Sequence, residues 1–367
     1  MPRPSPDVVR LFAARALRMF AYGLFSIVLV LHLSAAGLDG PAVGLLLTLT
    51  LLGDTAVSFV LTTRADRWGR RRTLLLGAAL SQELPAGART GVFAWYQLAG
   101  SLATAAGALA GGALAEGLQR RGLAPLTSYQ AVMAAYGLAG LLLAAIFAGL
   151  SARVEAPGRA APAGARAPWL GLHRSRGVVA RLSGLFAVDA FAGGFVVQSF
   201  VAWWFHVRFG LGPAALGGIF LGANVLAGLS ALSAAWLARR FGLVNTMVFT
   251  HLPSNVLLAA VPFMPTLPLA IGVLLVRFSI SQMDVPTRQA FTMAVVAPDE
   301  RSSAAGVTGI ARTVGAALSP LAAGPLYAVP ALAFLPFVLS GALKVGYDVA
   351  LWRSFRAHGA EEDAEAP

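Results

Sequence analysis

The sequence predicts an all-α protein that crosses a membrane many times, because an apolar composition is combined with long, regularly spaced apolar runs. Hydrophobic residues make up 57% of the chain, charged residues only 12%, and the mean hydropathy is +0.72. Soluble domains carry about 25% charged residues, so this composition indicates an integral membrane protein. The formal net charge of +12 lies largely on arginines in short loops, which indicates membrane orientation rather than nucleic-acid binding.

Ten apolar runs are long enough, at about 18 residues or more, to cross the hydrocarbon core. The first, near residues 14–38, follows an arginine-bearing N-terminus and is longer than a signal-peptide core, so we expect it to be retained. The other nine lie near residues 41–63, 91–115, 128–150, 184–206, 213–237, 244–262, 266–286, 303–326 and 329–352.

A segment at residues 151–182, rich in Ala, Pro, Gly and Arg, predicts a flexible cytoplasmic linker. It separates an N-terminal half (1–150) from a C-terminal half (183–356), which is followed by an acidic tail (357–367). Glycines and prolines recur at offsets of 171 to 173 residues, which predicts that the halves are structural repeats. The matched positions are Gly23 with Gly194, Pro41 with Pro213, and Gly69 with Gly242.

The loop at residues 64–72 contains five arginines in nine residues. Cationic loops remain on the cytoplasmic side, where headgroups are anionic, so we expect this loop to be cytoplasmic. Gly69 permits a tight turn, and Asp66 is placed to face both neighbouring guanidinium groups and the N-terminal end of the next helix. A plain arginine stop-transfer cluster is the alternative interpretation.

The order Asp-Arg-x-Gly-Arg-Arg resembles the signature loop between helices two and three of the major facilitator superfamily of secondary transporters. The resemblance implies two helical halves that alternate access to a central site. It also implies a cytoplasmic charge latch, for which Arg312 is our candidate partner of Asp66. Thr62 stands where the family usually has glycine, and residues 238–242 form a degenerate second copy without the aspartate. The implied gating residues are Asp66, Arg67, Gly69, Arg70, Arg71 and Arg312.

The repeat also predicts a shortened first half. Gly69 to Gly91 spans 22 residues, whereas Gly242 to Gly306 spans 64, a difference of 42 that corresponds to two membrane helices. We therefore expect about ten helices instead of twelve, with most of helices three and four missing. Both termini then lie in the cytoplasm, in a bacterial inner membrane. The arginine that many proton-coupled relatives carry on the fourth helix has no match, which leaves a coupling proton as an open option.

Polar groups at membrane depth are our candidates for contact with solute or coupling ion, because such groups usually face a cavity or a partner. Arg18 and Asp189 occupy equivalent repeat positions and could pair as a gate, with snorkelling as the alternative for Arg18. Lys344 and Asp348 are four residues apart, which predicts a local ion pair. Arg277 and Arg312 would favour an anionic or polar solute. The substrate or coupling candidates are Asp54, Arg18, Asp189, Gln198, Asn224 and Arg277.

The remaining motifs favour neither an enzyme nor a cofactor protein. The five histidines have no metal-ligand spacing, and neither a nucleophile elbow nor a phosphate loop occurs in a suitable context. Asp299 and Glu300 suit the N-terminal end of the helix that follows them. We expect a monomeric transporter of a small solute in a lipid bilayer. The alternative is a transport-dead membrane scaffold or a regulatory remnant of such a transporter, because the loss of two helices removes part of the cavity wall.

Overall fold

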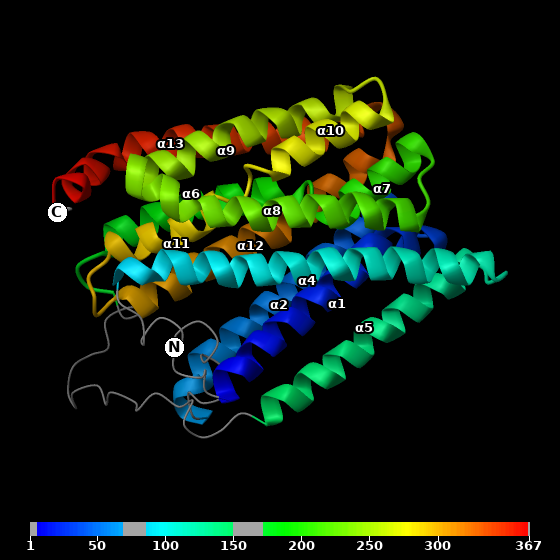
Figure 1. Ribbon diagram of the computed structural model, residues 1–367, viewed down its shortest axis with the longest axis horizontal. Helices are drawn as coiled ribbons and strands as arrows, with labels where there is room; N and C mark the ends of the chain where they lie inside the picture. Colours follow the sequence, from blue (N-terminus) through cyan, green and yellow to red (C-terminus); the bar gives the residue numbers. More distant parts are fainter. Residues whose placement is uncertain (1–5, 69–85, 150–171, 366–367) are drawn as a thin grey trace.

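A computed structural model describes residues 6–68, 86–149 and 172–365. Their helices pack side by side as long rods (Figure 1), and α1 begins at the same end of the bundle at which α13 ends. We call this the terminal end, and the opposite end, where α4 is followed by α5, the far end. In the N-terminal half the helices are α1 (Pro6–Ala35), α2 (Gly40–Trp68), α4 (Ala86–Arg120) and α5 (Pro125–Ala148).

The C-terminal half contains eight of the described α-helices and two short 3-10 turns, at Val261–Phe263 and Pro330–Leu332. Gly210, with a φ of +68°, ends α7 in the left-handed region that glycine adopts readily, and Pro213 then begins α8. The helices are α6 (Arg176–Gly194), α7 (Gln198–Phe209), α8 (Pro213–Phe241), α9 (Leu243–Ala260), α10 (Leu267–Phe278), α11 (Asp284–Ala294), α12 (Arg301–Ala328) and α13 (Leu335–Glu365).

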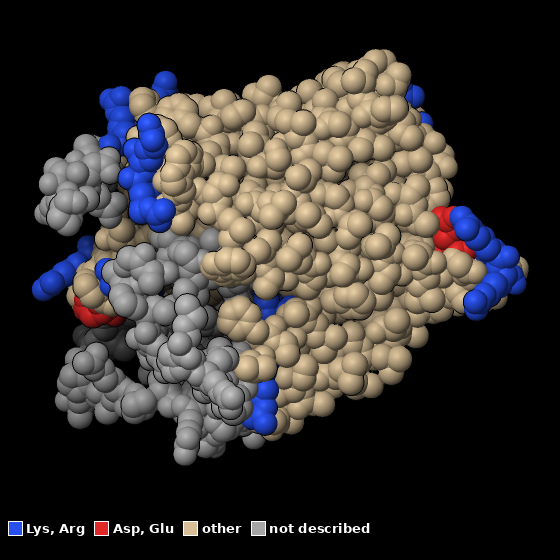
Figure 2. Space-filling model, viewed as in Figure 1, with Lys and Arg blue, Asp and Glu red and all other residues tan. Residues whose placement is uncertain are grey.

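Seven helical segments of the described residues are long and apolar enough to cross a bilayer, and two further apolar helices are shorter. The surface agrees with this, because Figure 2 shows the charged side chains gathered mainly towards the two ends of the molecule and a largely uncharged band between them. The seven segments are Phe12–Ala35, Gln97–Arg120, Pro125–Ile146, Arg176–Phe209, Pro213–Phe241, Leu243–Phe263 and Pro330–Arg356; the shorter helices are Gly40–Gly53 and Leu267–Phe278.

Two of the predicted runs are interrupted in the structure. The run at 184–206 is divided between α6 and α7, after the pair Gly193–Gly194. The run at 266–286 ends as a helix at Phe278, and α11 starts only at Asp284. The expectation of one continuous helix to residue 286 was wrong, because residues 279–283 form turns and α11 carries charged side chains into the protein interior. Most of the interval from Gly69 to Gly91, on which the missing helix pair depends, lies outside the described residues.

Contacts between the halves are made mainly by two helix pairs, α4 with α8 and α2 with α12. Small residues permit this close approach at the far end: a Cβ at Gly44 would collide with the backbone of Pro320, and one at Gly112 with the backbone of Pro213. The core there is aromatic, with Phe200, Phe205 and Phe337 fully buried. The halves are therefore joined closely at the far end.

Candidate functional site

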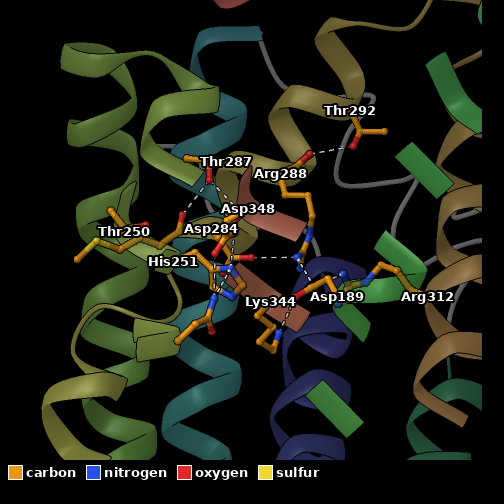
Figure 3. Close-up of polar contacts among 12 residues, drawn as sticks. Asp189, Thr250, His251, Asp284, Thr287, Arg288, Thr292, Arg312, Lys344 and Asp348 are labelled. Carbon is orange, nitrogen blue, oxygen red and sulfur yellow. Dashed lines mark hydrogen bonds and ion pairs between the residues drawn. The ribbon is translucent and has the colours of Figure 1, made fainter. Parts of the chain in front are cut away.

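A buried charge cluster joins four helices of the C-terminal half around Asp189 of α6 (Figure 3). Lys344 of α13 donates to one carboxylate oxygen of Asp189 at 2.5 Å. Arg288 of α11 and Arg312 of α12 donate to the other oxygen at 3.1 and 3.0 Å. Arg288 also bonds Asp284 of its own helix at 2.9 Å. One carboxylate thus holds three cations, and only Arg312 among them has substantial side-chain exposure, at 34%.

A second polar group lies beside this cluster, between α9 and α13. Asp348 pairs with Nδ1 of His251 at 2.8 Å through one oxygen and accepts a hydrogen bond from Asn255 at 3.0 Å through the other. The carboxylate of Asp348 is 1% exposed and the imidazole of His251 is 7% exposed. The three cations pair with the carboxylates of Asp189 and Asp284, whereas Asp348 bonds His251 and Asn255.

A polar bridge crosses from the N-terminal to the C-terminal half. Gln198, at the start of α7, donates to the hydroxyl of Ser26 on α1 at 2.7 Å. The amide of Asn224 on α8 donates to the side-chain oxygen of Gln198 at 3.0 Å. The Gln198–Ser26 hydrogen bond thus links α7 to α1 of the other half, and Asn224 extends the link to α8.

Comparison with known proteins agrees with this architecture. The profile of the Major Facilitator Superfamily matches residues 77–320, more than half of the chain. This protein belongs to the major facilitator superfamily. It is therefore an integral multi-pass membrane protein and a transporter rather than an enzyme.

Known relatives and solved structures extend the likeness over nearly the whole chain. An uncharacterized membrane protein of Saccharomyces cerevisiae is 27% identical over 419 residues, which cover 95% of this chain and 93% of the relative. A bacterial homolog to the human lysosomal transporter Spinster, in its inward-facing and occupied conformation, matches with a TM-score of 0.69 at 15% identity. The match covers 100% of this chain and 100% of that protein. The nucleoside transporter NupG has a TM-score of 0.59 at 14% identity, covering 96% of this chain and 100% of that protein. At these identities the solved structures show the shared major facilitator fold.

Several predicted residues of this transporter meet in space, with partners other than the expected ones. Asp189 and Arg312 bond each other, so Arg312 already has a carboxylate partner in this structure. Arg18 is exposed on α1, and no ion pair between Arg18 and Asp189 is found among the described residues, so the gate stays a prediction with snorkelling as the alternative. The local Lys344–Asp348 ion pair was a wrong expectation, because Lys344 bonds Asp189.

The remaining candidates lie at the edge of the cluster or outside the described residues. The guanidinium of Arg277, at the end of α10, lies 4.9 Å from the ring centroid of Phe278 and interacts electrostatically with Asp284. The side chains of Asp54, Asp66 and Arg67 lie outside the described part of the structure, as do residues Gly69, Arg70 and Arg71 entirely. The motif latch therefore stays a prediction.

Sequence reasoning missed four members of the buried site: His251, Asn255, Asp284 and Arg288. The predicted run at 266–286 ends between Asp284 and Arg288, and His251 was considered only as a metal ligand. A signal was available for both, because an ionisable residue inside an apolar run normally has a buried partner. The i, i+4 spacing of Asp284 and Arg288 also predicts pairing on a helix.

Glu300 fastens the connection between the two halves to the loop before α12. Its carboxylate accepts backbone N–H groups of His173, of Arg174 at 2.8 Å and of Ser175 at 2.8 Å. Glu300 was expected to cap its own helix α12, and this was wrong, because its carboxylate binds the free N–H groups that precede α6. Burial alone raises the pKa of Glu300, but these hydrogen bonds outweigh burial and lower its pKa to about 2.

The depressed pKa of Glu300 makes a pH-dependent contribution to stability. This contribution is complete above its ordinary pKa of 4.5 and is lost as the pH falls towards about 2. We expect Glu300→Gln to lower the melting temperature at neutral pH and to flatten the decline over that acid range. Thermal unfolding of the detergent-purified protein at a series of pH values measures this. Asp299→Asn, an exposed neighbour, is the control, and parallel pH profiles for wild type and Glu300→Gln would contradict the assignment.

Proposed function

We propose that the protein moves a small solute across the membrane by alternating access between its two halves. The observation that carries this is a close contact between the halves at the far end, next to a polar bridge between them. At the far end, α2 and α12 approach so closely that a Cβ at Gly40, Gly44 or Gly324 would strike the backbone or Cβ of the facing helix. The polar Ser26–Gln198–Asn224 bridge lies between the same two halves. A sealed end beside a polar site is the arrangement that a rocking transporter requires.

Similarity to an inward-facing, occupied relative supports a conformation in which the halves are closed against each other at the far end. That structure scores 0.69, whereas the same relative in its inward-facing, unoccupied form scores 0.56 over 96% of each chain. We propose that both termini lie in the cytoplasm, so that the sealed far end faces outward. The arginine-rich loop at residues 64–72 then lies on the cytoplasmic side, as the positive-inside rule requires. Asp66 retains its proposed role in the cytoplasmic latch.

Gln198 is our candidate for a direct solute contact. It joins Ser26 and Asn224 across the halves, so a solute that enters between the halves meets its amide. We expect Gln198→Leu to lower solute flux about tenfold, because one lost hydrogen bond is worth about 1 kcal/mol and the amide of Asn224 also loses an acceptor. The measurement is uptake of radiolabelled polar solutes into proteoliposomes.

The matched control is Asn245→Leu, which removes an exposed amide that bonds only the Phe241 carbonyl of its own helical turn. It should leave flux unchanged. If the folded wild-type protein carries none of the solutes, the scaffold alternative is favoured and alternating-access transport is rejected. If Gln198→Leu and Asn245→Leu behave alike, transport stands but Gln198 is not a contact residue.

A further inference from the structure

Arg277 stands in the last turn of α10, on the face of this helix that points into the protein. Leu274 and Ala270, about one and two turns before it, are buried, whereas Val276 and Leu269 are exposed. The Nε atom of Arg277 is itself buried. The charge of Arg277 therefore lies on the interior side of α10 and not on its lipid-facing side.

Two buried polar atoms at this point have no hydrogen-bond partner among the described residues. They are Nε of Arg277 and the hydroxyl of Ser281, which is 4% exposed and lies in the turn between α10 and α11. Phe278 covers one flat face of the guanidinium, at 4.9 Å, and leaves the N–H groups at its edge for an acceptor. Buried donors without an acceptor are costly, so a ligand that supplies oxygen acceptors gains affinity here.

The charges of the buried cluster do not balance once Arg277 is counted. Arg277 interacts electrostatically with Asp284, but that carboxylate already bonds Arg288. The cations among the described residues of the cluster are Arg277, Arg288, Arg312 and Lys344, and the carboxylates are Asp189, Asp284 and Asp348. One positive charge is therefore in excess, and a proton on His251 would add to it. A buried excess of charge is costly, and one bound anion removes it.

The turn that follows Arg277 lies beside the boundary between the halves. It is fastened to α8, because the backbone N–H of Gln282 donates to the hydroxyl of Ser230 at 3.3 Å. The polar bridge meets the same helix at Asn224, six residues before Ser230, which corresponds to about 9 Å along a helix. Beyond the turn, α11 packs against α4 of the N-terminal half. A solute that enters between the halves can therefore reach both the bridge and Arg277.

We propose that Arg277 binds the negatively charged group of the transported solute, and that this solute is an organic anion with a single carboxylate. The proposal rests on the proposed transport function and names its substrate class. A guanidinium presents paired N–H groups that match the two oxygens of a carboxylate, and the hydroxyl of Ser281 is a further donor beside it. A single negative charge fits, because the cluster has one positive charge in excess. A neutral molecule of the same shape leaves that excess in place.

Thermal unfolding of the detergent-purified protein tests the anion site without transport. The probes are simple carboxylates paired with their neutral amides: acetate with acetamide, lactate with lactamide, and benzoate with benzamide. At least one carboxylate should raise the melting temperature of the wild type by about 2 °C or more while its amide does not. Arg277→Gln should abolish this shift, and Arg277→Lys, which keeps the charge but loses the paired N–H groups, should reduce it. The anion site is overturned if no carboxylate exceeds its amide, or if Arg277→Gln keeps the full shift.

Arg208→Gln is the matched control. Arg208 is also followed by a phenylalanine, at 5.7 Å from the centroid of that ring, but it is exposed at the end of α7, so its loss should leave the carboxylate shift unchanged. Arg277→Gln should in addition leave the ligand-free protein at least as stable as the wild type, because it removes an unbalanced buried charge. A marked fall in its melting temperature, or failure to fold, would show that Arg277 serves the structure and would overturn the proposal.

Uptake of the same radiolabelled pairs into proteoliposomes distinguishes failure of this proposal from failure of the transport function. A carboxylate-dependent shift in melting temperature without any flux rejects transport and leaves the anion site. Flux of the amides at the rate of the carboxylates, unchanged in Arg277→Gln, rejects the anion site and leaves transport.

Discussion

Asp189→Asn is expected to destabilise the protein by about 3–5 kcal/mol, the usual cost of removing one partner from a buried ion pair. The asparagine leaves Lys344, Arg288 and Arg312 facing one another with only Asp284 to balance them. The three cations come from α11, α12 and α13, so their repulsion separates the helices that Asp189 now joins. Thermal denaturation of the detergent-purified protein, followed by loss of the monodisperse chromatographic peak, measures the change.

Two further variants test whether the loss of stability is specific to Asp189 or follows from removing any acidic side chain. Asp299→Asn removes an exposed carboxylate at the α11–α12 loop and should change stability by less than about 1 kcal/mol. The double variant Asp189→Asn with Lys344→Met removes one of the stranded cations and should recover part of the loss, which is a coupling that a double-mutant cycle measures. Wild-type stability in Asp189→Asn, or simple additivity in the double variant, contradicts the central place of Asp189.

The long helices of this fold were predictable from local sequence, because a segment that crosses a bilayer must be a long apolar helix whatever its neighbours are. The runs near 41–63 and 213–237 correspond to α2 and α8, and the structure extends both into their polar flanks. Breaks within a run were harder to foresee. The division at Gly193–Gly194 is a tertiary feature, since a Cβ at Gly194 would lie 2.5 Å from the Cβ of Ser319 on α12.

Pairing within the charge cluster was predictable only in part. The sequence identified Asp189 and Arg312 as ionisable groups at membrane depth, and both belong to the cluster. The partner of Lys344 was missed, because the i, i+4 rule considers one helix alone, whereas α6 brings Asp189 to the same lysine. Distances between helices far apart in sequence depend on packing, and spacing along the chain does not contain that information.

The second large effect is expected at the far end, where Gly44→Ala should shift the protein away from its sealed state. A Cβ at Gly44 would collide with the backbone of Pro320, which cannot move as a flexible side chain does. Overpacking of this kind costs about 1–3 kcal/mol, and a cost confined to one conformation shifts the population about 5- to 150-fold. Because the chain has no cysteine of its own, labelling of Val30→Cys reports this directly.

Val30 is 3% exposed and lines a small pocket beside Gly40 and Gly324. A membrane-impermeant maleimide should therefore react with a cysteine at position 30 only when α2 and α12 separate. Gly53→Ala is the control on the same helix, since its new Cβ meets nothing within 4 Å. Gly324→Ala strikes the same contact from α12 and should raise labelling as Gly44→Ala does. Equal labelling rates in the Gly44→Ala and Gly53→Ala proteins would show that the glycine contact does not hold the far end shut, because the added methyl group would then open nothing.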